Sequence, residues 1–424
     1  MRNVVAAIIG NAFEFYDFVT YAFFAVQIGH VFFPSQSEYA SLMLSLGTFG
    51  AGFAMRPIGG ILIGRYADRV GRRPAMILSL SLMGGAVLAV AIVPSYAAIG
   101  IAAPVLVVIA RMAQGFALGG QVGPTTAFLM EAAPLPQRGL YAAWQGGSQY
   151  CASLAGGMVG IVLSTFMDAG SFQAYGWRIA FALGALALPF GLFLMRSIPE
   201  TLHDSVRNAP RADSDWSMLV ANRRVIVLGL VTLASATIFT YITNYMTTFA
   251  ENVLHLGNAV AFGATIIVGV SGLAGVVFGG WVSDRWGRWP TMVWPRAAYL
   301  LLVLPSYAWI VEQRSAVALY CATAVLVFLG TMSVGPFYAA LSESLPARIR
   351  GSTVGTTYAV SITIFGGSAQ LIVTWLLHIS GNPLAPAWYL IASGACGLVA
   401  TAMMAETAPA RVGYAPRPAS AAAE

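Results

Sequence analysis

The chain alternates between long apolar runs and short polar connections. Each apolar run is about 20 residues long, the length of helix that crosses the hydrocarbon core of a bilayer. None shows the strict apolar–polar alternation of a barrel strand. The pattern therefore predicts membrane-spanning helices. Twelve are expected, at residues 4–29, 39–64, 74–95, 99–125, 140–165, 177–196, 223–249, 259–282, 291–311, 316–340, 352–377 and 386–406.

Composition supports this interpretation. Apolar residues make up 58% of the chain and charged residues only 9%, with a mean hydropathy of +0.75. A soluble domain carries about 25% charged residues, so lipid must cover much of this surface. Spanning segments must then satisfy every backbone polar group internally, as helices do. We expect an all-α integral membrane protein.

Positive charge is distributed unevenly along the chain. All 22 basic residues are arginine, and 17 of them fall near the termini or in every second connection. The positive-inside rule then places both termini in the cytoplasm, in a multi-pass protein of a bacterial cytoplasmic (inner) membrane. The net charge of +6 follows from this topology and does not indicate a nucleic-acid partner. Glu14 and Asp17 within the first apolar run argue against a cleavable signal peptide.

A ten-residue motif occurs twice. GRYADRVGRR, starting at Gly64, and GWVSDRWGRW, starting at Gly280, each follow an apolar run and lie 216 residues apart. The pairs Glu131–Arg138 and Glu343–Arg350 repeat at a spacing of 212 residues. Two related six-helix halves are therefore expected. The predicted organisation is a first half at 1–196, a cytoplasmic linker at 197–222, a second half at 223–406 and a disordered cytoplasmic tail at 407–424.

Several segments resemble one family of the major facilitator superfamily. GNAFEFYDF at 10–18, FAMRPIGG at 53–60 and RMAQGFALGG at 111–120 are similar to metabolite:proton symporters. AAWQGGSQ at 142–149 resembles their citrate/tricarboxylate branch. The resemblance implies twelve helices in two parallel halves, with a substrate site between the halves near the midplane. It also implies proton-coupled uptake of a small organic acid by alternating access, with citrate or a related tricarboxylate as the first expectation.

Other functions stay open at this point. Within the family, the substrate could be a dicarboxylate, an aromatic acid or a zwitterionic osmolyte. A non-transporting membrane sensor on the same scaffold is an alternative of another class. Enzyme activity is not expected, because the four histidines and three cysteines are scattered and form no metal-ligand or catalytic pattern. No cofactor is expected, and the protein is expected to act as a monomer.

Ionisable residues inside the predicted helices are candidates for the transport chemistry, because buried charges are costly in a membrane. Glu14 and Asp17 lie about 10 and 13 residues into the first helix, near the midplane, and at least one is expected to couple a proton. Arg111 has a similar depth, and its planar guanidinium suits a carboxylate. The alternative is a permanent ion pair of these acids with Arg111 or Arg56. We expect Arg56 to be structural or gating, and the shallower Arg296 to reach toward the interface.

Uncharged polar residues on helix faces could complete a substrate site. Their hydroxyl and amide groups suit a polyoxygenated ligand, whereas the alternative is hydrogen bonding between helices. These candidates are Asn11, Tyr21, Gln114, Gln145, Gln149, Tyr241, Asn244, Tyr245 and Tyr358.

The repeated motifs are expected, by resemblance to the superfamily, to gate the cytoplasmic side. Asp68 and Asp284 are expected just before the third and ninth helices, where the helix dipole stabilises an acid. The alternative is that the arginines only signal topology. The gating candidates are Asp68, Arg69, Arg72, Glu131, Arg138, Asp284, Arg285, Arg288, Glu343 and Arg350.

Three positions depart from the family pattern. Gln121 stands where the family often has Glu, and Thr247 and Gln370 stand where it has Pro. The missing acid at position 121 is expected to affect proton stoichiometry or the charge of the substrate.

Overall fold

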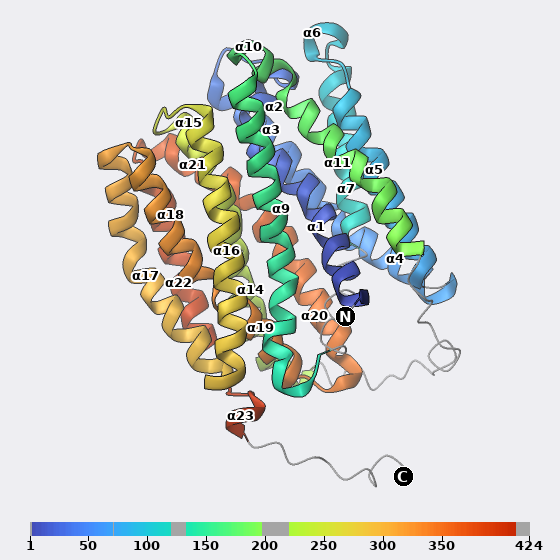
Figure 1. Ribbon diagram of the computed structural model, residues 1–424, viewed down its shortest axis with the longest axis vertical. Coiled ribbons are helices and arrows are strands. Elements are labelled where there is room, and N and C mark those ends of the chain that lie inside the picture. The colour runs from blue at the N-terminus through green and yellow to red at the C-terminus, as the bar shows by residue number, and fades with distance from the viewer. Residues whose placement is uncertain (1, 71, 120–132, 197–219, 413–424) are drawn as a thin grey trace.

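The computed structural model describes residues 2–70, 72–119, 133–196 and 220–412. Every regular element within these ranges is a helix. The long helices run side by side along the long axis of the molecule (Figure 1). We call the end that carries α23 (Pro409–Val412) the motif end, and the end that carries α6 (Tyr96–Ile99) the far end.

We refer to the helices up to residue 196 as the first half. Their bounds are α1 (Arg2–Phe23), α2 (Ala25–Phe32), α3 (Glu38–Ala54), α4 (Arg56–Val70), α5 (Arg72–Ile92), α6, α7 (Ala102–Gly119), α9 (Arg138–Phe166), α10 (Ala169–Ser171) and α11 (Trp177–Arg196). The short turns η1 (Leu135–Gln137) and η2 (Phe172–Gly176) precede α9 and α11.

We refer to the helices from residue 223 onward as the second half. Its helices are α14 (Arg223–Asn244), α15 (Met246–Asn252), α16 (Asn258–Trp286), α17 (Arg288–Gln313), α18 (Ala316–Thr331), α19 (Val334–Ser344), α20 (Ala347–Ser361), α21 (Gly367–Ser380), α22 (Ala385–Ala402) and α23. Five crossings are interrupted: α1–α2, α3–α4, α14–α15, α18–α19 and α20–α21. Counted as one crossing each, the described long helices agree with the twelve predicted ones.

The interruption between α3 and α4 follows from the sequence. Pro57 has no N–H, so the Phe53 carbonyl four residues earlier loses its helical donor. The hydroxyl of Thr363, in the π-helical turn η3 (Ile362–Gly366), donates to that carbonyl at 3.3 Å. A break inside one half therefore becomes a contact with the other half.

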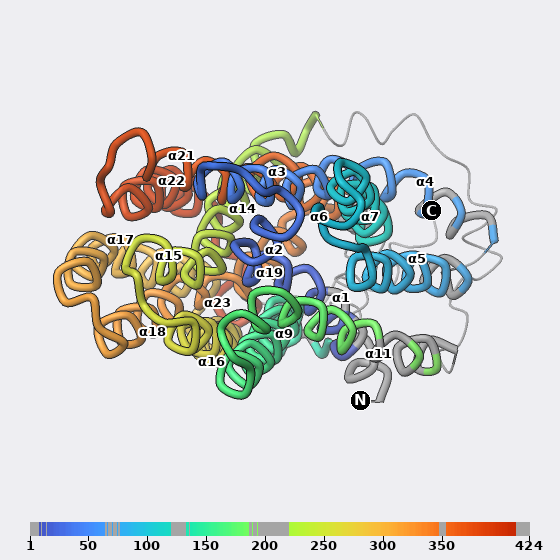
Figure 2. The backbone as a smooth tube through the Cα atoms, turned by 90° about the horizontal axis from the view of Figure 1, so that it is seen from above, coloured from blue at the N-terminus to red at the C-terminus, as the bar shows by residue number. Residues whose placement is uncertain are grey.

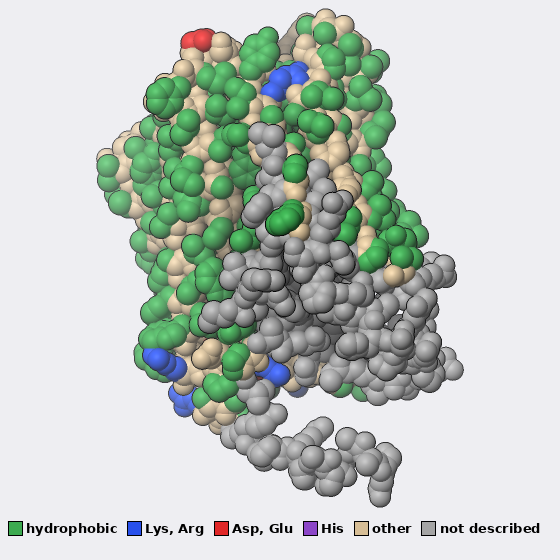
Figure 3. All heavy atoms as spheres, turned by 45° about the vertical axis from the view of Figure 1, so that its right-hand side comes forward, with side chains coloured by type: hydrophobic (Ala, Val, Ile, Leu, Met, Phe, Trp, Pro, Cys, Tyr) green, Lys and Arg blue, Asp and Glu red, His purple; other side chains and the backbone are tan. Residues whose placement is uncertain are grey.

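Apolar side chains cover the flanks of the described bundle. Figure 3 shows hydrophobic side chains over most of its height, with charged groups near the two ends. Large apolar side chains such as Phe166 and Leu301 are 83% and 79% exposed. An apolar surface this extensive is stable when lipid covers it and unfavourable in water. By length and composition, eight of the described helices could cross a membrane. This surface agrees with the predicted membrane location.

The two halves lie next to each other when the molecule is viewed from the far end (Figure 2). The most extensive contact between them joins α9 to α16, and another joins α3 to α21. In the second contact, a Cβ placed on Gly50 would lie 2.8 Å from the Gly367 carbonyl oxygen. Glycine at position 50 therefore allows the two backbones to meet, as small residues do between membrane helices.

The start of the tail differs from the prediction of disorder after residue 406. Residues 407–412 are described, and they include the helical turn α23. The Thr407 hydroxyl donates to Glu343 at 2.8 Å, and Arg411 Nε donates to the Trp286 carbonyl at 3.2 Å. These bonds explain why the first tail residues pack on the second half. Residues 413–424 and most of the predicted linker, 197–219, lie outside the described residues.

Candidate functional site

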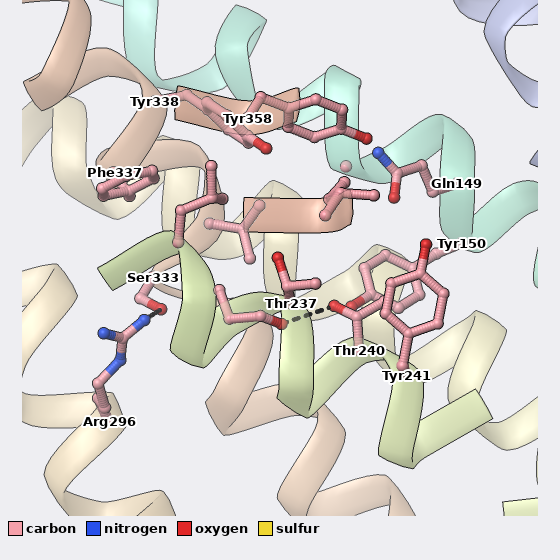
Figure 4. Close-up of a pocket in the computed structure, with 15 residues that line it drawn as sticks. Gln149, Tyr150, Thr237, Thr240, Tyr241, Arg296, Ser333, Phe337, Tyr338 and Tyr358 are labelled. Atoms are coloured by element: carbon pink, nitrogen blue, oxygen red, sulfur yellow. Dashed lines mark hydrogen bonds between the residues drawn. The ribbon is translucent and has the colours of Figure 1, made fainter. Parts of the chain in front are cut away.

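A small cavity lies between the halves. It measures about 50 Å³ and is lined by α9 from the first half and by α14, α17, α19 and α20 from the second. Figure 4 shows Arg296 and Ser333 at one end of it, Gln149 and Tyr358 at the other, and Thr237 between them. Since one water needs about 10–15 Å³, the cavity has room for a few waters.

A second cavity of about 20 Å³ adjoins the first. The two share the lining residues Gln149, Tyr150, Thr240 and Tyr241. The second is also bounded by Phe18 of α1 and by Asn244 of α14. Among the uncharged candidates from the sequence, the structure brings four to these cavities: Gln149, Tyr241, Asn244 and Tyr358.

Arg296 is a cation that lines the larger cavity, so the expectation that it reaches toward the interface is wrong. Its side chain is only 6% exposed. It donates to the Thr401 hydroxyl at 2.8 Å and to the Ser333 hydroxyl at 3.4 Å. Both partners are neutral, and among the described residues Arg296 makes no ion pair. A buried guanidinium with neutral partners keeps its attraction for an anion.

Arg111 and Asp17 lie together in the first half. Arg111 Nη1 is 3.7 Å from Asp17 Oδ2 and also donates to Gln114. The Arg111 guanidinium lies over the Tyr21 ring, 4.5 Å from its centroid. Neither Asp17 oxygen accepts a hydrogen bond. This geometry matches the ion pair considered as the alternative, and neither residue lines the two cavities.

Arg56 is buried beside aromatic rings. Its guanidinium lies 4.6 Å from the Phe18 centroid and 4.3 Å from the Phe53 centroid. The side chain is 3% exposed, and none of its three guanidinium nitrogens has a hydrogen-bond partner. Phe18 and Tyr241, whose rings are 6.0 Å apart, line the smaller cavity. Aromatic side chains therefore lie between Arg56 and the cavities.

The remaining uncharged candidates lie among packed helices, and one of them, Tyr245, also lines a separate cavity of about 260 Å³ at the far end. Asn11 donates to a hydroxyl of α9 at 2.6 Å, and Tyr21 donates to a carbonyl of α3 at 3.2 Å. Tyr245 accepts from a hydroxyl of α21 at 2.9 Å. Gln114 accepts from Arg111, as described above. The Gln145 amide is buried, and neither of its polar atoms has a hydrogen-bond partner.

A network of ionised groups joins the halves at the motif end. The Asp284 carboxylate accepts from the backbone N–H groups of Gly139 and Leu140 at 2.9 and 3.0 Å. These amides open α9 of the other half and have no intrahelical acceptor. Arg288 donates to Asp284 at 2.6 Å and to both Glu343 oxygens at 3.3 and 3.1 Å. Asp284 thus caps a helix of one half while it is paired to an arginine of its own half.

The predicted place of Asp284 before helix nine is wrong. Helix α16 continues to Trp286 and ends at Gly287, whose φ of +107° is favourable only for glycine. Asp284 therefore lies in the last turn of α16. The acid at the N-terminus of α17 is instead Glu406, which accepts from the N–H groups of Arg288 and Trp289 at 2.8 and 3.0 Å.

The other gating candidates are only partly described. Arg285 is exposed and lies over the Trp281 ring, 4.0 Å from its centroid. The Arg138 Nε is buried and has no hydrogen-bond partner. The side chains that lie outside the described part of the structure are those of Glu14, Asp68, Arg69, Arg72, Gln121, Glu131 and Arg350.

The far end joins the halves through a ring stack and a contact between two side chains. The rings of Tyr39 and His378 stack with their centroids 3.8 Å apart and 13° between their planes. Gln27 Nε2 of α2 lies 3.5 Å from Glu251 Oε2 of α15. The described halves therefore touch at both ends, and the cavity of about 260 Å³ lies between them at the far end.

Comparison with known proteins identifies the fold. The family model described as Major Facilitator Superfamily matches residues 7–367. The chain belongs to this superfamily. It is similar to the citrate-proton symporter of Klebsiella pneumoniae, at 35% identity over 92% of this chain and 89% of that protein. It is also similar to the alpha-ketoglutarate permease of Escherichia coli (strain K12), at 34% identity over 91% of this chain and 89% of that one.

The solved structures agree. The crystal structure of a D-xylose-proton symporter matches with a TM-score of 0.78 at 20% identity, covering 97% of this chain and 99% of that chain. The twelve-helix, two-half major facilitator fold predicted from the sequence is thereby confirmed. The chain is a multi-pass membrane transporter of this superfamily and not an enzyme.

The sequence did not reveal the contacts of three residues that the structure makes functional candidates. Arg296 was placed too near the membrane surface, although its apolar surroundings in the ninth helix were visible. Glu406 stood at the end of the last predicted helix with no indication of its partner. Glu251 lay two residues beyond the predicted seventh helix, and its contact with Gln27 depends on how the halves meet.

Proposed function

We propose that this protein is a proton-coupled symporter that takes up a small anion with two or three carboxylates, with citrate as the first candidate. The observation that carries the proposal is an imbalance of buried charge. Four described guanidiniums are at most 6% exposed, and one of them, Arg288, is paired with two carboxylates of its own half. Beside the other three, those of Arg56, Arg111 and Arg296, Asp17 is the one buried carboxylate described. Uncompensated buried charge is costly unless a ligand supplies the opposite sign.

The relatives support an acidic substrate. The two similar proteins named above carry citrate and alpha-ketoglutarate in their names, and both compounds are carboxylic acids. We place the substrate at the cavity lined by Arg296, where Gln149, Thr237 and Tyr358 add neutral hydrogen-bonding groups. Arg56 and Arg111 would bind further carboxylates once the rings of Phe18 and Tyr241 move aside.

Proton coupling is assigned to Asp17, with Glu14 as the second acid of the same helix. Asp17 lies 3.7 Å from Arg111 and accepts no hydrogen bond. When a substrate carboxylate binds Arg111, Asp17 loses its counter-ion, and a buried carboxylate in that position takes up a proton. Substrate and proton would then cross together, because each favours binding of the other.

Alternating access supplies the movement. The two cavities lined by α9 and α14 are too small for an organic acid, so the halves must rock apart for a substrate to bind there. We assign residues 1–196 and 223–406 to the two halves and 197–222 to the linker. The motif end is assigned to the cytoplasm of a bacterial inner membrane, with both termini on that side and the monomer as the working unit.

Uptake of labelled citrate into proteoliposomes, with and without an inward proton gradient, tests the proposal. Gradient-dependent accumulation is expected, and unlabelled dicarboxylates, aromatic acids and betaine serve as competitors. Arg296→Gln should weaken binding about 10- to 100-fold, since a hydrogen bond to a charged group contributes about 1.5–3 kcal/mol. Arg314→Gln removes the same charge from the exposed end of α17 and should leave binding unchanged. Binding without accumulation would overturn the symporter in favour of a sensor.

A further inference from the structure

Glu251 and Gln27 face each other across the two halves at the far end. Gln27 is 3% exposed. Its Nε2 lies 3.5 Å from Glu251 Oε2, which is a long hydrogen bond. The other two oxygens of the pair, Glu251 Oε1 and Gln27 Oε1, are both buried and have no hydrogen-bond partner. With the carboxyl ionised, the pair therefore has one donor, the Gln27 Nε2 amide group, and three acceptors, which are the Gln27 amide oxygen and the two Glu251 oxygens.

Protonation of the carboxyl would correct this shortage. An ionised carboxylate only accepts hydrogen bonds, whereas a protonated one also donates through its O–H. A neutral carboxylic acid and a primary amide can form two bonds at once. The amide N–H donates to one acid oxygen, and the acid O–H donates to the amide oxygen. The two unpartnered oxygens of Glu251 and Gln27 are the atoms that this second bond needs.

The surroundings of Glu251 supply no other means of neutralising it. Glu251 makes no ion pair among the described residues, and burial raises the pKa of its carboxyl from 4.5 to about 8. It lies at the far terminus of the α14–α15 crossing, outside the hydrocarbon core, since 28 residues of helix from Arg223 extend about 42 Å and the core is about 30 Å thick. The titratable or charged side chains on the elements packed at this end include His30, Glu38, Tyr39, Tyr96, Tyr175, Arg178, Tyr245, His255, Tyr307, Glu312, Arg314, Tyr320 and His378.

We propose that Glu251 and Gln27 form a second proton-binding site, separate from Asp17, and that the far end closes fully only when this site holds a proton. The role of this site in transport rests on the proposed function, in which the far end faces the outside of the cell. An open far end would then expose Glu251 to the external medium. Closing would bury the carboxyl against Gln27 together with one external proton.

The sign of the pH effect follows from linkage. In the closed state the carboxyl binds its proton up to about pH 8, whereas an exposed carboxyl releases it near pH 4.3. Closure is therefore favoured at low pH and is lost as the pH rises. One proton difference lowers the ratio of closed to open molecules by up to about tenfold per pH unit between about pH 5 and 8.

Distances between spin labels across the far end test the proposal without substrate. Gln36→Cys and Ile379→Cys place labels on exposed positions of the two halves, in protein whose Cys151, Cys321 and Cys396 are replaced by Ala. In otherwise wild-type protein, the short-distance population should fall as the pH rises from 5 to 8. A population that stays constant over this range would overturn the proposal.

Two further variants isolate the pair. Glu251→Gln keeps the shape and permanently supplies the missing donor, so its closed population should stay high at pH 8. Gln27→Leu removes the amide that faces Glu251, so the closed population should be lower than in the wild type at pH 5 as well as at pH 8. Glu312→Gln removes an exposed acid at the same end and should keep the wild-type pH dependence. Glu251→Gln with the full wild-type slope would contradict the proposal. A failure of citrate uptake leaves these distances unaffected, so the two proposals fail separately.

Discussion

The two ends of the bundle join the same halves with opposite chemistry. At the motif end, Asp284 and Arg288 are ionised groups whose partners are complete, including two backbone amides of the other half. At the far end, the contact between Glu251 and Gln27 leaves two buried oxygens without partners. A completed network holds one geometry over a wide range of conditions, whereas an incomplete one depends on the proton that completes it. The comparison suggests that protein contacts hold one end closed and a proton helps to hold the other.

The largest expected effect is that of removing Arg288. Arg288→Ala leaves Asp284 and Glu343 partly buried without their cation, and loss of one partner of a buried pair costs about 3–5 kcal/mol. Denaturation in detergent micelles should show this loss of unfolding free energy. Arg285→Ala, which removes an exposed neighbouring arginine, should change it by less than about 0.5 kcal/mol. Equal losses in both variants would show that the network does not stabilise the protein.

A methyl group at Gly139 should open the motif end. A Cβ there would lie 2.5 Å from the Ser283 hydroxyl and 2.8 Å from Asp284 Oδ1, and it would also meet Arg288. Crowding of this kind costs about 1–3 kcal/mol, and Gly139→Ala should fall at the upper end. Label distances across the motif end should lengthen. Gly47→Ala, where no atom lies within 4 Å, is the matched control.

Gly50→Ala should open the far end instead of the motif end, and its effect should be smaller than that of Gly139→Ala. Its Cβ would meet one atom closely, the Gly367 carbonyl oxygen, at 2.8 Å. The cost should lie near the lower end of about 1–3 kcal/mol, and the labels across the far end should move apart. Gly47 lies one turn earlier in the same helix and again provides the control. If Gly50→Ala and Gly139→Ala open the same end, the assignment of the two contacts is wrong.

The smallest effect is expected for Thr363→Val. The substitution keeps the shape of the side chain and removes the hydrogen bond to the Phe53 carbonyl, at a cost of about 0.5–1.5 kcal/mol. The closed population of the far end should fall by up to about tenfold. Thr243→Val, which removes a hydroxyl bonded within its own helix, should leave that population unchanged.

The sequence predicted the helices well because lipid imposes a simple length and composition rule on them. It predicted Arg111 and Asp17 as buried charges for the same reason. Depth along a helix does not reveal which neighbour a side chain meets, so the site was predicted less well. The sequence predicts that Arg296 reaches toward the interface, and that the dipole of the helix following Asp284 stabilises its carboxylate. Both errors concern contacts with distant segments, Thr401 for the first and Gly139 for the second.

The cap that Asp284 places on α9 makes one helix of the first half depend on the second. If the halves separate at the motif end, the amides of Gly139 and Leu140 lose their acceptor at the same moment. The first turn of α9 must then bind water or unwind. Each transport cycle would thus remove and restore the cap of a helix terminus far from the substrate. The rate at which these two amide hydrogens exchange with deuterium would therefore report how often the motif end opens.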